Sequence, residues 1–127
     1  MVTKKNQCNQ NNGCNIYNEL SKKWALIIIK DFFLGCKKFN DFLEINTNLS
    51  NKVLSDQLKR LEKYGFINKR VVSTTPLRAE YELTKIGQDL NKVIYEKFIF
   101  GIKHGFIDIN CPHFKGKSLE EIFKINK

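Results

Sequence analysis

The chain has 127 residues, which is enough for one domain with a modest core and calls for no second globular unit. It carries 22 lysine and arginine residues against 13 aspartate and glutamate residues, and the net charge of +9 favours a polyanionic partner or surface. The longest apolar run, Trp24 to Ile29, is too short to cross a membrane, and the polar N-terminus lacks the apolar centre of a signal sequence, so we expect a cytoplasmic protein with no membrane partner.

The first part of the chain is expected to contain a tail and two helices. Residues 1–13 are rich in asparagine and glutamine and show no apolar periodicity, so they are predicted to form a polar tail. Ile16 and Leu20 suit a short helix, and Trp24–Phe33 predicts a second helix, apolar nearly all round and ended by Gly35. A helix this apolar is expected at the centre of the core.

A short helix and a longer one are predicted next. Phe39–Leu43 carries apolar residues at the spacing of one helical face, and the polar stretch Asn46–Asn48 after it predicts a turn. Ser50 is the expected N-cap of a helix that runs to Tyr64 and ends at Gly65. The leucines of this helix lie on one stripe, and its polar and basic side chains point largely elsewhere: Asn51, Lys52, Ser55, Lys59 and Lys63.

Basic residues are concentrated in one region of the sequence. Ser50–Arg78 holds seven of them and only two acidic residues, so this region supplies +5 of the net charge. Concentrated charge of one sign is what a phosphate-contacting surface requires, because neutralising phosphates releases their counterions. The alternative is a solvated, lysine-rich surface.

Two β-prone segments predict a hairpin after the basic helix. The segments are Phe66–Val72 and Ala79–Leu83, and the residues between them, 73–78, are expected to form a loop. Arg78 lies at the expected tip beside Pro76, a placement that suits an arginine reaching into the narrow minor groove of A·T-rich DNA. The alternative is a solvated loop arginine.

The last part of the chain is predicted to be helical. Thr84 can cap a long helix that runs towards His104 and ends at Gly105. The rest of the chain, 105–127, is expected to be an extension in which a capping box at Ser118 begins a short terminal helix.

The order of these elements is that of a winged helix-turn-helix domain, with the basic helix in the place of the recognition helix. The expected fold class is therefore α+β and mainly α, with a two-stranded wing, an N-terminal helix and a long C-terminal helix. The major groove of double-stranded DNA admits one helix, which keeps its leucine stripe on the scaffold and presents polar and cationic side chains to bases and phosphates.

The candidate DNA contacts follow from this placement. Asn and Lys side chains can bond adenine and guanine edges, and cations further along lie near the phosphates. Asp56 can accept a bond from cytosine, but its spacing favours the alternative, a pair with Lys52 or Arg60 four residues away. The candidates are Lys38, Ser50, Asn51, Lys52, Ser55, Asp56, Lys59, Arg60, Lys69, Arg70 and Arg78.

Six short motifs occur in an order and spacing typical of one family. They are Lys23–Trp24, Lys38–Phe42, Leu49–Ser55, Leu58–Glu62, Gly65–Ile67 and Pro76–Gly87. Together they resemble the HxlR-type branch of the MarR-like winged-helix regulators over about Tyr17–Leu90, and Pro76–Thr84 in the wing is the most specific part. Lys22 and Asn51 depart from the pattern, since the family usually has glycine and proline, respectively, at these places.

The resemblance implies a sequence-specific transcriptional regulator that binds double-stranded DNA as a homodimer on a pseudo-palindromic operator. It also implies that the N-terminal helix and the long helix from Thr84 form most of the dimer interface. The expected organisation is a tail at 1–13, a winged helix-turn-helix domain with its dimerisation helices at 14–104, and a C-terminal extension at 105–127.

Four cysteines in a reducing compartment indicate buried thiols, metal ligands or redox sensors rather than a disulfide framework. Several HxlR-type proteins sense oxidants or electrophiles through a cysteine near the N-terminus, and Cys14 is the matching candidate. Cys14 lies just before the first predicted helix, and the N-terminus of a helix favours a thiolate. The alternative for Cys14 is an unreactive thiol beside a dimer interface, and Cys36 is expected to be a core thiol. A disulfide from Cys8 or Cys14 to Cys111 is a further alternative. So is a zinc site, with the candidate ligands Cys8, Cys14, Cys111 and His113.

An enzyme is the least supported class of protein. The sequence has two histidines, no Gly-rich phosphate loop and no triad or carboxylate pair that we can place in one pocket, and we expect no cofactor. The stronger alternative is a winged-helix interaction module, in which the basic helix docks on an acidic protein without specific DNA readout. The sequence identifies no small-molecule effector.

Overall fold

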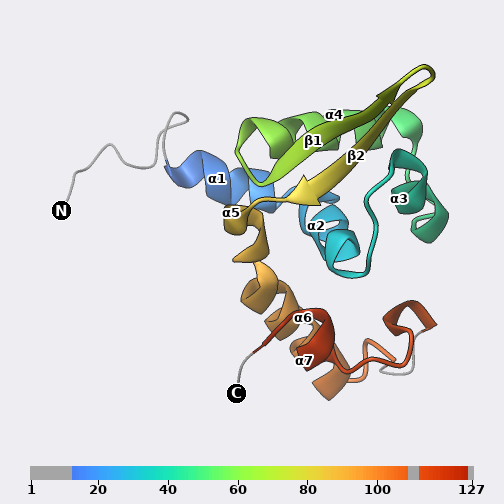
Figure 1. Ribbon diagram of the computed structural model, residues 1–127. Coiled ribbons are helices and arrows are strands. Elements are labelled where there is room, and N and C mark those ends of the chain that lie inside the picture. The colour runs from blue at the N-terminus through green and yellow to red at the C-terminus, as the bar shows by residue number, and fades with distance from the viewer. Residues whose placement is uncertain (1–12, 109–111, 126–127) are drawn as a thin grey trace.

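The computed structural model describes residues 13–108 and 112–125 (Figure 1). The described elements are α1 (Gly13–Leu20), α2 (Ala25–Phe33), α3 (Phe39–Ile45), α4 (Asn51–Lys63), β1 (Ile67–Thr74), β2 (Leu77–Leu83), α5 (Lys85–Gln88), α6 (Asn91–Lys103), a 3₁₀ turn (Pro112–Phe114) and α7 (Leu119–Ile122). A two-stranded antiparallel wing lies beside the helices and its tip projects beyond them, so the predicted winged helix-turn-helix class is confirmed. Within the described ranges, none of the helices has the length and apolar character needed to cross a membrane.

Helix α2 lies in the core, as its apolar sequence predicted. Ala25, Ile28 and Ile29 are fully buried. The buried carboxylate of Asp31 accepts a hydrogen bond from the Asn46 side chain, with 2.7 Å between Nδ2 and Oδ2. Because Asn46 directly follows α3, this bond helps to hold α3 against α2.

Helix α4 has the two faces that the sequence predicted. Leu54, Leu58 and Leu61 are buried against the core. The predicted N-cap is confirmed, since Ser50 Oγ accepts a hydrogen bond from a backbone N–H of the first turn at 3.1 Å. Gly65, with a φ of +85°, ends the helix as expected.

The wing is longer than the sequence predicted. The loop expected over 73–78 is wrong, because strand pairing continues to Thr74 and Leu77. A β-bulge just before Ser73 accommodates one extra residue, and this lets the ladder resume beyond it. Arg78 therefore lies within β2, opposite Ser73 and close to the turn.

The single long helix predicted from Thr84 is also wrong, because the chain divides it into α5 and α6. Thr84 does cap α5, with Oγ1 accepting the backbone N–H of Gly87 at 3.1 Å. The two helices dock on different parts of the chain: Gly87 lies against the backbone of Phe66, whereas Asn91 Nδ2 at the start of α6 donates to the carbonyl oxygen of Phe123 at 2.7 Å. The break lets both contacts form.

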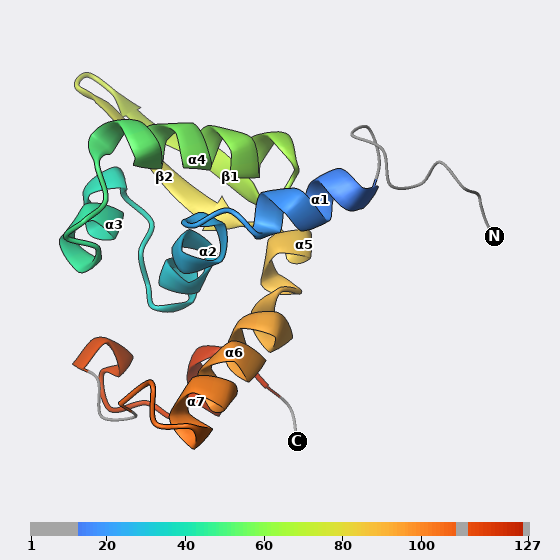
Figure 2. The ribbon, with the colours of Figure 1, turned by 180° about the vertical axis from the view of Figure 1, so that it is seen from behind.

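The C-terminal segment, 112–125, packs on α6 and α2 at the end of the molecule away from the wing tip (Figure 2). The Phe98 ring of α6 packs against the rings of both Phe114 and Phe123, with centroid distances of 5.4 and 5.6 Å. The predicted capping box of Ser118 with Glu121 is confirmed. The segment thus extends the core through its buried side chains, Phe114, Leu119, Ile122 and Phe123.

Candidate nucleic-acid interface

The exposed face of α4 lies opposite its buried leucines. Asn51 and Lys52 are exposed in the first turn, Ser55 is half-buried one turn further on, and Lys59 and Lys63 are exposed beyond it. Residues three and four apart lie on the same side of a helix, so these side chains form one surface. This surface combines short hydrogen-bonding groups, which suit base edges, with cations that suit phosphates.

Lys52 and Asp56 form an ion pair on this surface. Lys52 Nζ lies 3.1 Å from Asp56 Oδ2, and the two side chains are 85% and 44% exposed. The hydrogen bond from Lys52 lowers the pKa of the Asp56 carboxyl, and the charge of the same lysine acts in the same direction. The pairing that the four-residue spacing favoured is therefore confirmed, and it is a solvent-screened pair from which Lys52 can turn towards a phosphate or base at small cost.

Arg60, a predicted DNA contact, bonds side chains of the protein itself while its own side chain stays partly exposed. Its Nε lies 3.1 Å from Oε2 of Glu19 in α1, and its Nη2 donates to Gln57 Oε1 at 3.3 Å. Sequence reasoning missed Glu19 and Gln57 as partners. Gln57 was the available signal, because it is a polar residue beside the leucine stripe, where an apolar residue is expected.

The wing carries a second set of basic side chains. Lys69, Arg70 and Arg78 are all exposed, and Arg70 Nη2 pairs with Glu80 Oε1 across the strands at 3.0 Å. The base of the wing is tied to the segment before α3, because the backbone N–H of Tyr81 donates to the carbonyl oxygen of Lys37 at 2.7 Å. This bond fixes the wing relative to the helix-turn-helix unit.

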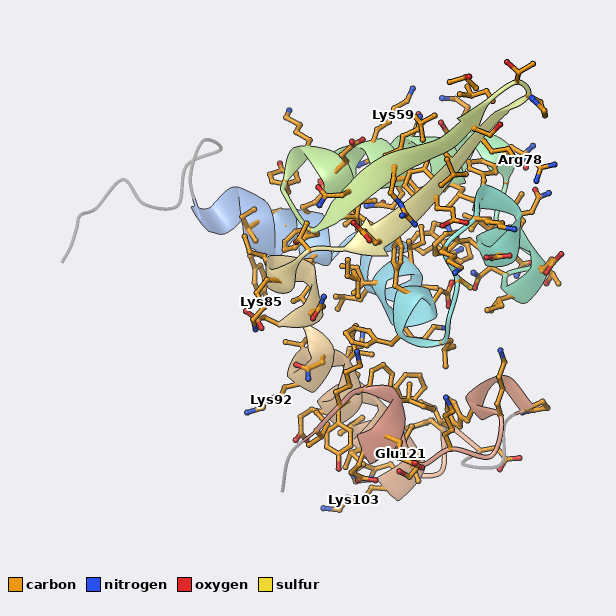
Figure 3. The ribbon with its side chains drawn as sticks, in the orientation of Figure 1. Lys59, Arg78, Lys85, Lys92, Lys103 and Glu121 are labelled. Carbon is orange, nitrogen blue, oxygen red and sulfur yellow. The ribbon has the colours of Figure 1, made fainter. Side chains whose placement is uncertain are left out.

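A surface groove connects the wing with α3. Lys38 and Arg78 both line it, together with Phe39 and Leu77. Figure 3 shows Lys59 and Arg78 at the wing end of the molecule, with Lys103 and Glu121 at the opposite end. Lys38, just before α3, and the basic side chains of α4 and of the wing therefore lie at the wing end of the molecule.

The start of α3 is organised by Asp41. Burial raises the pKa of its carboxyl, but the backbone N–H groups of Lys38 and Lys37 donate to Oδ2 at 2.9 and 3.1 Å, and with the charges of these lysines they lower the pKa overall. The ionised carboxylate thereby holds the backbone that carries Lys38.

The predicted cysteine sites fall largely outside the described part of the chain. Cys8 and Cys111 lie outside the described residues, and the side chains of Cys14 and His113 are also not described. The zinc and disulfide alternatives therefore stay predictions. Among the described residues, no His, Cys, Asp and Glu cluster suits a metal ion. Helix α1 begins at Gly13, so the prediction that it starts after Cys14 is wrong, because apolar side chains mark only the packed part of a helix.

Cys36 is a core thiol, as expected. It is buried at the end of the α2 segment, and burial, followed by the charges of Asp31 and Asp41, raises its pKa to about 12. A thiol with this pKa stays protonated and unreactive at neutral pH.

A basic recognition helix on a leucine-packed scaffold, beside a basic wing, defines a DNA-binding protein of the winged helix-turn-helix class. The sequence profile described as HxlR-like helix-turn-helix matches residues 19–104, and the chain belongs to this family. It is thus a transcriptional regulator of HxlR/MarR type and not an enzyme.

Relatives of known sequence and structure agree with this assignment. The HTH-type regulator YvaP of Bacillus subtilis, described as uncharacterized, is 38% identical over 77 residues, which cover 61% of this chain and 71% of YvaP. YodB of Bacillus subtilis in its reduced form superposes with a TM-score of 0.61 at 29% identity, covering 70% of this chain and 87% of YodB. The redox regulator HypR in its reduced form gives a TM-score of 0.65 at 27% identity, covering 71% of this chain and 89% of HypR.

Proposed function

We propose that this protein represses or activates transcription as a homodimer that reads a pseudo-palindromic operator with α4. The observation that carries the proposal is the exposed polar and basic face of α4, opposite fully buried leucines. Asn51, Lys52 and Ser55 face the base edges in this arrangement, and Ser50 lies beside them at the helix start. Phosphate contacts come from Lys38, Lys59, Lys69 and Arg70, while Arg78 reaches the minor groove.

Exposed apolar side chains on three helices support the homodimer. Tyr17 of α1 is 75% exposed, Ile86 of α5 is 58% exposed, and Val93 and Phe100 of α6 are 47% and 61% exposed. Large apolar side chains gathered on neighbouring helices favour a protein interface, and a two-fold interface buries the same surface on both copies. The helices are those that the family resemblance implies for dimerisation.

A redox input through Cys14 is part of the proposal. Two structural relatives, HypR and YodB, have been captured in reduced and in oxidised or diamide-treated forms. Cys14 lies in the first turn of α1, and the N-terminus of a helix favours a thiolate. Diamide is expected to change operator binding by the wild type and to leave a Cys14→Ser variant unaffected.

A gel-shift series at increasing salt tests the DNA-binding function. We expect duplex binding whose affinity falls steeply with salt, and a Lys52→Ala variant that loses its preference between operator and random duplex. Operator fragments come from selection of bound genomic DNA. Salt-insensitive or absent DNA binding by a folded protein would overturn the proposal and favour the interaction module.

A further inference from the structure

Helix α1 contacts the recognition helix through a polar network that is largely buried. Glu19 is 4% exposed and Gln57 is 2% exposed. Glu19 Oε2 accepts hydrogen bonds from Gln57 Nε2 at 3.2 Å and from Arg60 Nε at 3.1 Å, and Arg60 also bonds Gln57 at 3.3 Å. One carboxylate oxygen thus holds two side chains of α4.

The network contributes less to the free energy of unfolding than apolar packing at the same place would. Removing a carboxylate from water carries a penalty that its partners only partly offset, and an apolar residue at position 57 would extend the neighbouring leucine stripe. A directional contact in its place restricts α4 to one rotation and one position relative to α1, because hydrogen bonds depend on angle and distance whereas leucine packing tolerates small shifts.

We propose that Glu19 is a positioning residue for the recognition helix: through Gln57 and Arg60 it holds α4 in the orientation in which the α4 face reads the operator. This inference rests on the proposed DNA-binding function. It assigns Arg60 to the contact with Glu19 and Gln57 rather than to a phosphate.

The same contact links the recognition helix to the dimer. Tyr17, two residues before Glu19 on α1, is 75% exposed and belongs to the apolar surface that we assign to the second copy. Helix α1 therefore lies between the partner subunit and α4. The distance between the two recognition helices of the dimer then depends on the Glu19 network, and so does the match to the half-site spacing of the operator.

The decisive variant is Glu19→Gln, which keeps the shape of the side chain and removes its charge. We expect operator affinity to fall about tenfold, because the uncharged amide holds Arg60 less strongly than the carboxylate does and a weakened coupling contact changes binding by roughly one order of magnitude. Affinity for random duplex is expected to stay the same or rise slightly, since the variant is less acidic. Net charge alone would predict that the variant, which is more cationic, binds the operator more tightly. A loss of operator affinity therefore cannot come from the change in charge.

Asp89→Asn is the matched control. It also converts a carboxylate to an amide, and it breaks the exposed pair of Lys85 Nζ in α5 with Asp89 Oδ1 just after α5, which are 2.6 Å apart. We expect its operator affinity to stay within about twofold of the wild type, because exposed pairs contribute little. If wild type and control both fail to bind any operator, the proposed function fails; if they bind and Glu19→Gln binds equally well while folded, the positioning role is overturned.

Arg60 provides a second test that does not depend on Glu19→Gln folding. The Arg60 side chain is 40% exposed, so Arg60→Gln is expected to fold, as thermal melting can verify. We expect its operator affinity to fall with an unchanged salt slope, and the double variant to bind no more weakly than either single variant. A salt slope lowered by about 1, with additive losses, would identify Arg60 as a phosphate ligand and overturn the inference.

Discussion

Gly87 of α5 lies directly against the carbonyl oxygen of Phe66, where the recognition helix passes into the wing. A Cβ atom at position 87 would lie 2.2 Å from that oxygen. The same oxygen accepts a hydrogen bond from the backbone N–H of Thr84 at 3.0 Å, which holds it in place. The contact fixes the start of α5 on the base of the wing.

Gly87→Ala is therefore expected to destabilise the protein by about 2 kcal/mol, because the backbone must shift to admit the methyl group. Chemical denaturation followed by circular dichroism measures this change in the free energy of unfolding. Gln88→Ala, at the exposed neighbouring position, is the control and is expected to change it by less than about 0.5 kcal/mol. Equal stability of the two variants would contradict the close contact.

Val93→Glu is expected to shift the protein from dimer to monomer, because a carboxylate in an apolar two-fold interface loses its hydration. Val72→Glu on the wing is a matched control, since Val93 and Val72 are 47% and 46% exposed. Light scattering at micromolar concentration distinguishes the outcomes. A Val93→Glu variant that stays dimeric would place the interface elsewhere.

Lys59→Ala is expected to weaken binding to operator and random duplex by a similar factor, and to lower the salt slope by about 1, because one phosphate contact is lost. Lys103→Ala removes the same charge at the opposite end of the molecule (Figure 3) and is expected to leave the slope unchanged. Gel shifts at several salt concentrations provide both the binding affinity and the salt slope of each variant. The same slope for both variants would indicate that net charge alone attracts DNA.

The Cys36 thiol predicts a pH dependence of stability. Its folded-state pKa of about 12 lies above the ordinary value of 9.0, so its contribution to stability is fully present below pH 9 and is lost as the pH rises towards 12. Unfolding free energies of wild type and Cys36→Ala across this range isolate the effect from that of lysines and tyrosines. As the pH rises, we expect the free energy of unfolding of the wild type to fall by several kcal/mol relative to that of Cys36→Ala. A difference between the two proteins that does not change with pH would contradict the raised pKa.

Features that depend on neighbours along the chain were determined by the sequence alone. The Ser50 cap, the leucine stripe of α4 and the pairing of Lys52 with Asp56 all rest on residues within one or two helical turns. Periodicity and capping chemistry act over the same range, so the order of elements and the polar face of the recognition helix followed from pattern.

Only the tertiary structure decided the features that join distant segments. Arg60 pairs with Glu19, a residue 41 positions away, and the helix from Thr84 breaks because its two halves dock on the wing base and on the C-terminal segment. A β-bulge likewise brings Arg78 into a strand. Each outcome depends on which surfaces the fold brings together, and local periodicity holds no information about a partner forty residues away.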